Sequence, residues 1–513
     1  MRSQEIFVSL DIGTTSIKVV VAEAINGRVN IIGVGNEKSR GLSRGVIVDI
    51  DETVYSIQQA VAQAERKAGV KINEVVVGVP SNQLAIEECH GMIAVSGENR
   101  EITYRDVENV IAAAKVRSIP PEREIISIIP EEFIVDGFNG IRDPRGMIGV
   151  RLELYARLIT GPKTIIHNIR RCVQKAGLYI SEFVLQPQAI SQVAINRDER
   201  EFGTVIIDMG GGQTSASILY DNQLKYSFVD QEGGDFVTKD ISVILNTSLD
   251  SAERIKREYG YSIASQTSED EYFPVETVGK KEPVRVDEHY LAEIIEARLA
   301  QIFETIREDL ARVDALDLPG GFVLTGGGSA LPGVIELAKR YFGGKVRMYV
   351  PEEMGMRNPV YTTGLGLVEY VSSLDDIHRI AQSSFQDVRR EEVRVPRRPM
   401  TREVGDSVDS EIESDTYYDQ SSKASKSTFS GLSNFSNKLK KQFASKNHSN
   451  EVLEEESFDD YSSPTVDDQL MDDNIYYEEV FDENVEMNKQ SSNPATSGNV
   501  TDKMRSFFET FFD

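Results

Sequence analysis

Two short segments of the sequence combine an aspartate with glycines and hydroxyl-bearing residues in the same order. The first reads D-I-G-T-T-S from Asp11, and the second reads D-M-G-G-G-Q-T from Asp208. Glycine lacks a Cβ atom, so successive backbone N–H groups in such a turn can point at one anion and bind phosphate oxygens. A carboxylate beside a phosphate needs a cation between them, and Mg²⁺ that keeps its waters suits this role. We therefore expect Asp11 and Asp208 to hold Mg²⁺ through water.

Each segment has the same surroundings, because it joins two apolar strands and is followed by a tight-turn dipeptide and a third strand. The dipeptides are Asn26-Gly27 and Asp221-Asn222, and the third strands are predicted at Val29–Val34 and Gln223–Phe228. An isolated Asp-x-Gly is usually only a β-turn. Two matching copies, 197 residues apart, instead indicate a duplicated domain whose equivalent turns face one another. The predicted phosphate-binding residues are Gly13, Thr14, Thr15, Ser16 and Lys18 in the first copy, and Gly210, Gly211, Gly212, Gln213 and Thr214 in the second.

A third glycine-rich element lies near the end of the patterned region. Gly321–Ser329 reads G-F-V-L-T-G-G-G-S, a buried strand that opens into three glycines, and a helix is predicted from about Gly333. Such a backbone surface suits a nucleotide base and α-phosphate, with a simple strand–helix turn as the alternative. The sequence has no G-x-x-x-x-G-K-[ST], H-E-x-x-H or paired C-x-x-C, so a P-loop or a zinc site is not supported. The base-binding residues would be Gly326, Gly327, Gly328 and Ser329.

The segments that must position these loops have the pattern of an α/β protein from about Glu5 to Val371. Short runs rich in Val and Ile alternate there with helical periods. From about Asp375 onward, Ser, Asp, Glu and Asn dominate with little apolar periodicity, which is typical of a disordered linker. The clearest predicted helices are Asp51–Ala68, Thr164–Ala176 and Asp287–Val313.

Charge and cysteine content narrow the class of function. Lys and Arg total 56 against 83 Asp and Glu, a net charge of −27, which argues against a nucleic-acid-binding protein. The last 113 residues, with 10 basic and 25 acidic side chains, contribute −15 of this charge. Cys89 and Cys172 provide no disulfide framework and fit a reducing compartment. Without a signal-peptide core or the ~18 apolar residues that cross a bilayer, we expect a cytoplasmic protein.

The final residues, Val500–Asp513, have an amphipathic helical pattern that Thr501 or Asp502 could cap. Such a stripe is usually part of a core, but about a hundred polar residues precede it and offer none. We therefore predict that it binds a lipid interface. A second basic amphipathic stretch, Phe429–Lys446, is either a further membrane or partner contact or a weakly helical linker. The membrane-binding residues would be Met504, Phe507, Phe508, Phe511 and Phe512.

The three glycine-containing elements resemble the two phosphate motifs and the adenosine motif of the actin/Hsp70/sugar-kinase superfamily. Glu253 and Lys256, in S-A-E-R-I-K-R-E-Y-G, resemble the helix that contacts ribose and adenine in bacterial actins. Thr363–Gly366 resembles the second motif that connects the two domains of this superfamily. The resemblance implies that ATP is the cofactor, with Mg²⁺.

The segment Ser81–Thr160 resembles the subdomain inserted in the FtsA family of bacterial cell-division proteins. Its motifs include E-I-T-Y-R-D-V, I-I-P-E-E-F-I-V-D-G and D-P-R-G-M-I-G-V-R-L-E, and the likeness extends over about Glu5–Leu374. The resemblance implies an ATP-binding protein that polymerises into actin-like filaments and tethers the tubulin-like FtsZ to the cell membrane at the septum. Later division proteins of the membrane would be further partners, and the terminal helix resembles the membrane-targeting helix of this family.

The fold class implied is α/β: an actin-like two-domain fold with duplicated mixed-sheet cores, an inserted subdomain, and a disordered acidic linker that ends in an amphipathic helix. The predicted bounds are 1–81 and 164–200 for the domain 1 core, 82–163 for the inserted subdomain, 201–242 and 307–385 for the domain 2 core, 243–306 for its smaller lobe, 386–499 for the linker and 500–513 for the membrane helix.

Two further residues receive roles from the resemblance. Bacterial actins carry a glutamate that positions the attacking water where this chain has Gln186. An amide can orient water but is a feeble base, so Asp11, Gln186 and Asp208 would support at most slow hydrolysis, and Gln186 could be purely structural. Arg298, in I-I-E-A-R, resembles the signature by which this family binds the acidic tail of FtsZ. Arginine suits carboxylate recognition, with an arginine on a solvated helix face as the alternative.

Two other functions are compatible with the same superfamily. A small-molecule kinase would need an acidic base that faces a substrate pocket, and Gln186 does not provide one. A chaperone-type ATPase would need a β-rich peptide-binding domain after the core, where this sequence has a polar segment.

Overall fold

A computed structural model describes residues 5–25, 28–97, 99–116 and 119–382 of the 513-residue chain. The chain divides into two units, Met1–Pro396 and Arg397–Asp513, and all of the described residues belong to the first. The predicted linker 386–499, the stretch Phe429–Lys446 and the predicted membrane helix 500–513 lie outside the described residues. Within the described part, no helix is both long and apolar enough to cross a bilayer.

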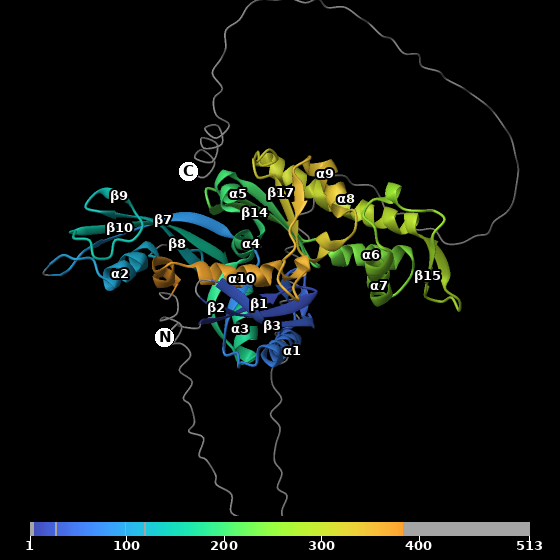
Figure 1. The fold of residues 1–513 in the computed structure, drawn as a ribbon, viewed down its shortest axis with the longest axis horizontal. Helices are drawn as coiled ribbons and strands as arrows, with labels where there is room; N and C mark the ends of the chain where they lie inside the picture. The colour runs from blue at the N-terminus through green and yellow to red at the C-terminus, as the bar shows by residue number, and fades with distance from the viewer. Residues whose placement is uncertain (1–4, 26–27, 98, 117–118, 383–513) are drawn as a thin grey trace, which may run out of the picture. The chain divides into compact units, whose positions relative to one another are not determined.

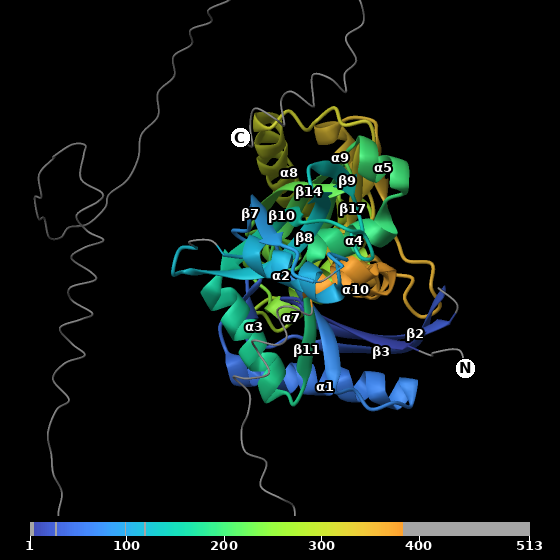
Figure 2. The ribbon, with the colours of Figure 1, turned by 90° about the vertical axis from the view of Figure 1, so that its left-hand side faces the viewer.

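The first sheet mixes an antiparallel meander with parallel strands. Its order is β11-β6-β1-β2-β3, in which β1, β2 and β3 pair antiparallel and β6 and β11 continue in parallel. Alternate residues of β2 enter opposite cores: Val19 and Val21 pack towards α1, whereas Val20 packs towards α10. Figures 1 and 2 show α1 and α10 on opposite faces of this sheet. The elements are β1 (Glu5–Ile12), β2 (Ser16–Ile25), β3 (Arg28–Lys38), β6 (Glu74–Val79), β11 (Tyr179–Leu185), α1 (Ile50–Ala68), α3 (Lys163–Lys175), α4 (Gln186–Ala194) and α10 (Thr362–Ser373).

The second sheet repeats this topology. Its order is β14-β13-β12-β17-β18, again a three-strand antiparallel meander continued by two parallel strands. The registers also correspond, because Asp11 lies opposite Lys18 and Asp208 lies opposite Ser215. The duplicated mixed-sheet core predicted from the sequence is confirmed. The elements are α5 (Arg197–Phe202), β12 (Thr204–Met209), β13 (Thr214–Tyr220), β14 (Gln223–Asp230), β17 (Phe322–Thr325), α9 (Val334–Phe342) and β18 (Val346–Met348).

Helix α1 illustrates why the predicted helices form where they do. The Asp49 side chain accepts a hydrogen bond from the Glu52 backbone N–H at 3.0 Å, which caps the first turn. Gly69 takes the left-handed conformation, with φ 69°, and ends the helix. The predicted helices Asp51–Ala68, Thr164–Ala176 and Asp287–Val313 correspond to α1, α3 and α8 (Glu288–Arg312), each within one residue at both ends.

The segment between the halves of the first domain folds into a separate antiparallel sheet of order β7-β10-β8-β9. Leu152, Leu154 and Ala156 on β10 face a core that α2 covers. This core also contains Ile377 and Ile380, from the helical turn after α10. The elements are β7 (Ala85–Ala94), α2 (Tyr104–Ala114), β8 (Arg123–Val135), β9 (Phe138–Ile141) and β10 (Arg151–Pro162).

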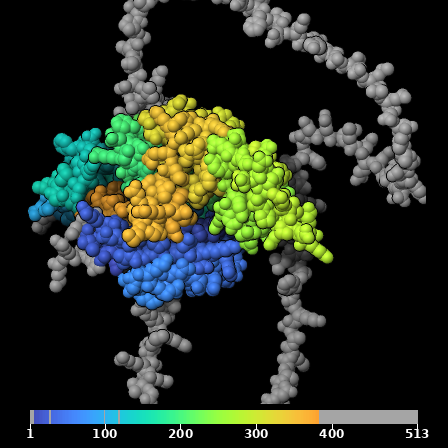
Figure 3. Space-filling view, turned by 45° about the vertical axis from the view of Figure 1, so that its right-hand side comes forward, coloured from blue at the N-terminus to red at the C-terminus, as the bar shows by residue number. Residues whose placement is uncertain are grey.

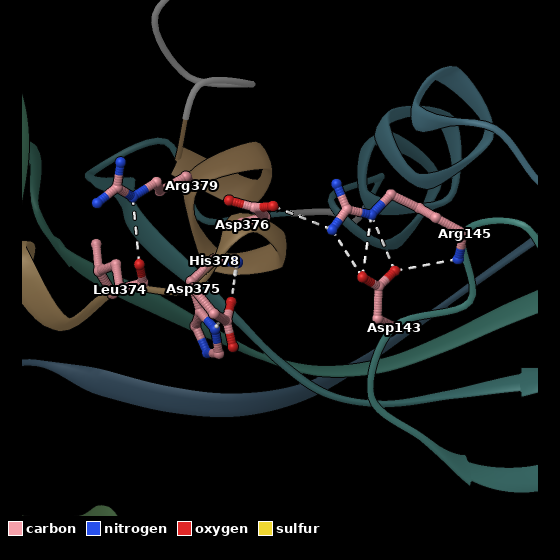
Figure 4. A network of polar contacts seen from close by, with 7 residues as sticks. All are labelled: Asp143, Arg145, Leu374, Asp375, Asp376, His378 and Arg379. Carbon is pink, nitrogen blue, oxygen red and sulfur yellow. Dashed lines mark hydrogen bonds and ion pairs between the residues drawn. The ribbon is translucent and has the colours of Figure 1, made fainter. Parts of the chain in front are cut away.

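Polar contacts also hold the helical segment after α10 against the inserted subdomain. Arg145, in the loop between β9 and β10, pairs with Asp143 at 2.7 Å and with Asp376 at 3.3 Å, and Figure 4 shows these three side chains beside the turn. Asp375 accepts a hydrogen bond from the His378 backbone N–H at 2.8 Å and so caps the turn. The predicted domain 2 core extended to residue 385, whereas α10 packs on the first sheet and the turn after it packs on the inserted sheet. Helical structure therefore continues beyond the predicted decay at Asp375, over residues 376–382.

A smaller lobe lies beside the second sheet and is light green in Figure 3. It is built on the long helix α8, whose buried residues include Leu291, Ile295 and Leu299. Its elements are α6 (Gly234–Ile244), α7 (Leu249–Tyr259), β15 (Tyr272–Val275), β16 (Val284–Asp287) and α8 (Glu288–Arg312).

Candidate functional site

The two phosphate-type loops touch each other directly. A Cβ atom placed on Gly212 would lie 2.5 Å from Oγ1 and 2.8 Å from Cβ of Thr14. A Cβ on Gly211 would lie 1.7 Å from Thr15 Oγ1. Because both atoms of Thr14 are too close, rotation of that side chain could not relieve the clash. Glycine at these positions is therefore a condition for the approach of the two domains.

Asp11 is held by two donors from different elements. Lys18 Nζ lies 3.1 Å from Asp11 Oδ2, and the Gln186 side chain donates to Asp11 Oδ1 at 3.1 Å. The Lys18 and Asp11 side chains are 8% and 6% exposed, so this ion pair is screened little by solvent. Lys18 was predicted to reach a phosphate, and in this structure its ammonium group neutralises Asp11.

Asp208 has a different environment. Among the described residues, no hydrogen-bonded or ion-paired cation is found at its carboxylate. Burial, together with the nearby charge of Asp11, raises the pKa of Asp208 to about 6. The two predicted Mg²⁺ carboxylates are therefore close enough to repel each other.

The third glycine element packs on Asp208. Gly326 has φ +86°, and a Cβ there would lie 2.2 Å from Asp208 Oδ1. Gly327–Ala330 form a short 3₁₀ turn in which Ser329 Oγ donates to the Gly326 carbonyl at 2.8 Å. All three glycine elements thus meet at one place, and their binding of phosphate and adenosine stays a prediction.

The loop from Gly210 to Thr214 is fixed by hydrogen bonds within the chain. The Gly210 N–H donates to the Gln213 carbonyl at 2.9 Å, and Thr214 Oγ1 donates to the Glu232 carbonyl at 2.9 Å. The Gln213 side chain accepts from Asn82 Nδ2 at 3.0 Å. In the first loop, the Gly13 N–H donates to the Ser16 carbonyl at 3.2 Å, which is the equivalent turn.

Glu253 and Lys256 form an ion pair at 2.6 Å on α7. Lys256 Nζ also donates to the Gly234 carbonyl at 2.9 Å, and the Gly234 N–H donates to the Gly210 carbonyl at 3.0 Å. The two residues predicted to contact ribose and adenine are therefore connected to the second phosphate loop through the start of α6.

The motif Thr363–Gly366 lies in α10 and allows close packing. A Cβ on Gly366 would lie 2.2 Å from the Ala189 carbonyl of α4. The Ser9 hydroxyl of β1 donates to the Gly364 carbonyl at 2.7 Å, and Thr362 Oγ1 lies 2.7 Å from Thr325 Oγ1 of β17. Helix α10 thus bonds to strands of both duplicated sheets.

Arg298 stands over the ring of Phe236, 5.7 Å from its centroid, and is paired with carboxylates of its own chain. Its Nε lies 2.6 Å from Asp240 Oδ2 and its Nη1 lies 2.7 Å from Glu232 Oε2. These two side-chain hydrogen bonds, Asp240 first, raise the pKa of the guanidinium above its ordinary value. The alternative of an arginine on a solvated helix face is wrong, because the side chain is 19% exposed.

Sequence reasoning missed several residues that contact the loops. Asp235 accepts a hydrogen bond from Thr15 Oγ1 at 3.3 Å across the domains, and burial raises its pKa. Arg44 and Phe236 stack beside the same loops at 5.2 Å. The sequence signal that could have revealed this contact is the Gly233-Gly234 pair immediately before Asp235.

No cluster of three or more His, Cys, Asp or Glu side chains within the described ranges could hold a metal ion directly. The polar groups at the junction are carboxylates, glycine N–H groups and threonine hydroxyls. These residues fit a triphosphate whose Mg²⁺ retains its waters.

Comparison with known proteins addresses the family. A family model described as cell division protein FtsA matches residues 205–366, and one for the SHS2 domain inserted in FtsA matches residues 81–160. The chain is 56% identical to the cell division protein FtsA of Enterococcus hirae over 382 residues, which cover 74% of this chain and 86% of that protein. The chain belongs to the FtsA family.

FtsA of Enterococcus faecalis is 57% identical over 382 residues, with 74% of this chain and 87% of that protein covered. FtsA of Bacillus subtilis is 46% identical over 370 residues, with coverage of 72% and 84%. Membership of the FtsA family confirms the family and the fold class that the sequence predicted, and it assigns the chain a role in cell division. The match to the inserted SHS2 domain falls on the segment that forms the sheet of β7 to β10.

Proposed function

We propose that this chain binds ATP with Mg²⁺ between its two duplicated sheets, polymerises as an actin-like filament, and tethers FtsZ filaments to the cell membrane at the septum. The observation that carries the nucleotide site is the meeting of Gly211 and Gly212 with Thr14 and Thr15, beside two carboxylates. Family membership supports the division role.

Within this site, glycine N–H groups and the hydroxyls of Thr14 and Thr15 would bind phosphate oxygens. Asp11 and Asp208 would hold the waters of Mg²⁺, which supplies positive charge between carboxylates and phosphates. Lys18 pairs with Asp11 at 3.1 Å, and Gln186, which donates to Asp11 at 3.1 Å, carries an amide in place of a basic carboxylate. We therefore expect weak hydrolysis at most.

The filament proposal is tested by electron microscopy of the full chain on lipid monolayers. With ATP and Mg²⁺, ordered filaments should form on the lipid. Their absence with ATP, under conditions in which the chain is folded and lipid-bound, would contradict polymerisation.

The membrane proposal rests on the apolar row of the last fourteen residues. Insertion of several aromatic side chains into a lipid interface contributes several kcal/mol before the helix-folding cost. The test is liposome sedimentation of the full chain against Phe507→Glu/Phe511→Glu. A matched control, Ser506→Glu/Thr510→Glu, adds the same charge on the opposite side of the helical pattern. The first variant should stop pelleting and the control should pellet; equal pelleting of wild type and the first variant would remove the anchor.

The acidic tail of FtsZ is the proposed ligand of the lobe that contains Arg298, with Asp240 and Glu232 as its internal competitors. Arg298→Glu should weaken binding of an acidic FtsZ tail peptide by about 1–3 kcal/mol. Asp240→Asn discriminates further, because it frees the guanidinium and should strengthen binding if Arg298 recognises the peptide. Weaker binding by Asp240→Asn in a folded protein would instead assign the ion pair a purely structural role. The inserted subdomain would bind later division proteins of the membrane.

A further inference from the structure

The hairpin between β3 and α1 has a rigid two-residue turn. It consists of β4 (Leu42–Ser43) and β5 (Val46–Ile47), and the turn residues Arg44 and Gly45 have φ of 49° and 73°. Positive φ at both central residues is the signature of a type I′ turn, which matches the twist of its strands. The turn therefore fixes the backbone from which the Arg44 side chain extends.

This turn lies against both phosphate-type loops. The Gly45 N–H donates to Thr14 Oγ1 of the first loop at 2.9 Å. A Cβ on Gly45 would lie 2.2 Å from Gln213 Oε1 of the second loop. Arg44 is thus one residue from atoms of both loops.

The guanidinium of Arg44 stands over the ring of Phe236, 5.2 Å from its centroid. Phe236 belongs to the first turn of α6, where the N–H groups of Gly234 and Asp235 donate to the carbonyls of Gly210 and Gly211 at 3.0 and 2.8 Å. Stacking uses the face of the guanidinium and leaves its in-plane N–H donors available for phosphate oxygens.

The other basic residues around the loops are ion-paired, which distinguishes Arg44 from them. Lys18 is paired with Asp11, Lys256 with Glu253, and Arg298 with Asp240 and Glu232. Across the described residues, no carboxylate is ion-paired with Arg44, whose side chain is exposed. An incoming phosphate would therefore meet an uncompensated positive charge at Arg44.

We propose that Arg44 binds the terminal phosphate of a nucleoside triphosphate and that Phe236 positions it. The proposal rests on the proposed function of the cleft as a nucleotide site. The element predicted to bind adenosine, Gly326–Ser329, packs on Asp208 of the second sheet, whereas Arg44 belongs to the hairpin that follows the first sheet. A nucleotide that extends from one side to the other brings its last phosphate to Arg44.

The test compares the affinities of the full chain for ATP and ADP, each with Mg²⁺, by titration calorimetry. Arg44→Ala should weaken ATP binding by about 10- to 100-fold, the range for a charge-assisted contact, and leave ADP within about 3-fold. Arg44→Gln, which keeps the length but not the charge, should do the same. Phe236→Leu should give a smaller loss, also confined to ATP.

Arg40→Ala is the matched control. Arg40 also stacks on an aromatic ring, that of Tyr55 at 5.7 Å, but its guanidinium is paired with Glu52 of α1. It should bind both nucleotides as wild type does. Equal losses of ATP and ADP, or unchanged ATP affinity in both Arg44 variants, would overturn the role of Arg44. A wild-type chain that binds neither nucleotide would instead contradict the proposed function of the cleft.

Discussion

The two duplicated sheets share one backbone plan but differ in their electrostatics. In each, an aspartate is the last residue but one of the central strand and lies opposite the residue seven positions later, which is Lys18 for Asp11 and Ser215 for Asp208. The first aspartate therefore has an ammonium group at 3.1 Å. The second faces a hydroxyl-bearing residue, and burial with the charge of Asp11 raises its pKa to about 6.

This difference shows what a duplication provides and what it leaves to individual side chains. The strand order, the register and the glycine turns bring two carboxylates together. The second half has Ser215 where the first half has Lys18. Only Asp11 is therefore paired with a lysine of the same sheet. Among the described residues, Asp208 has no paired cation of this kind.

The largest effect is expected from removal of the internal cation. Lys18→Met leaves the buried Asp11 with the Gln186 amide alone, and loss of one partner of a buried ion pair costs about 3–5 kcal/mol. Urea unfolding at pH 7, followed by circular dichroism, measures the change. Ser215→Ala, at the equivalent position of the second half, should cost less than about 1 kcal/mol. Equal losses in the two variants would contradict the asymmetry.

The pH dependence of stability should carry the signature of Asp208. Because its pKa is raised in the folded protein, the folded state binds more protons than the unfolded state between about pH 4 and about pH 6. The contribution of Asp208 is therefore fully present below about pH 4 and is lost as the pH rises to about 6. Asp208→Asn should remove this component from urea unfolding curves measured across that range. If the free energy of unfolding depends on pH in the same way in Asp208→Asn as in wild type, the raised pKa does not belong to Asp208.

A smaller effect is expected when the second half is given the charge pattern of the first. Ser215→Lys places an ammonium group opposite Asp208, as Lys18 is opposite Asp11, and should lower the pKa of Asp208 below about 6. Carboxyl carbon NMR titration of the variant measures this shift. A pKa that stays at about 6 would mean that register alone does not determine the pairing.

The sequence was sufficient for features that depend on short segments. The paired Asp-x-Gly turns, the three-strand repeats and the glycines of the third loop all follow from local pattern, and helix bounds agree because caps such as Asp49 and Gly69 are local. Features formed between distant segments could not be predicted in this way. Arg44 and Phe236 are 192 residues apart, and no local pattern connects them.

The same limit explains two other differences. The carboxylates that occupy Arg298 come from α6 and from the segment before it, so its pairing depends on how α8 packs. The turn after α10 has few apolar residues, yet Ile377 and Ile380 complete the core of the inserted sheet. A pattern read along one segment cannot reveal a core supplied by another.

The measurement that tests the central claim most directly is calorimetric titration of Mg²⁺-ATP into the wild-type chain and Gly212→Ala. A Cβ at Gly212 would lie 2.8 Å from Thr14 Cβ, whereas a Cβ at Gly344 meets nothing within 4 Å, which makes Gly344→Ala the control. The account predicts one ATP bound per chain by wild type and by the control, with a loss of at least about 10-fold in Gly212→Ala, or about 1.4 kcal/mol. Wild-type affinity in Gly212→Ala would contradict a nucleotide site formed by the two glycine loops.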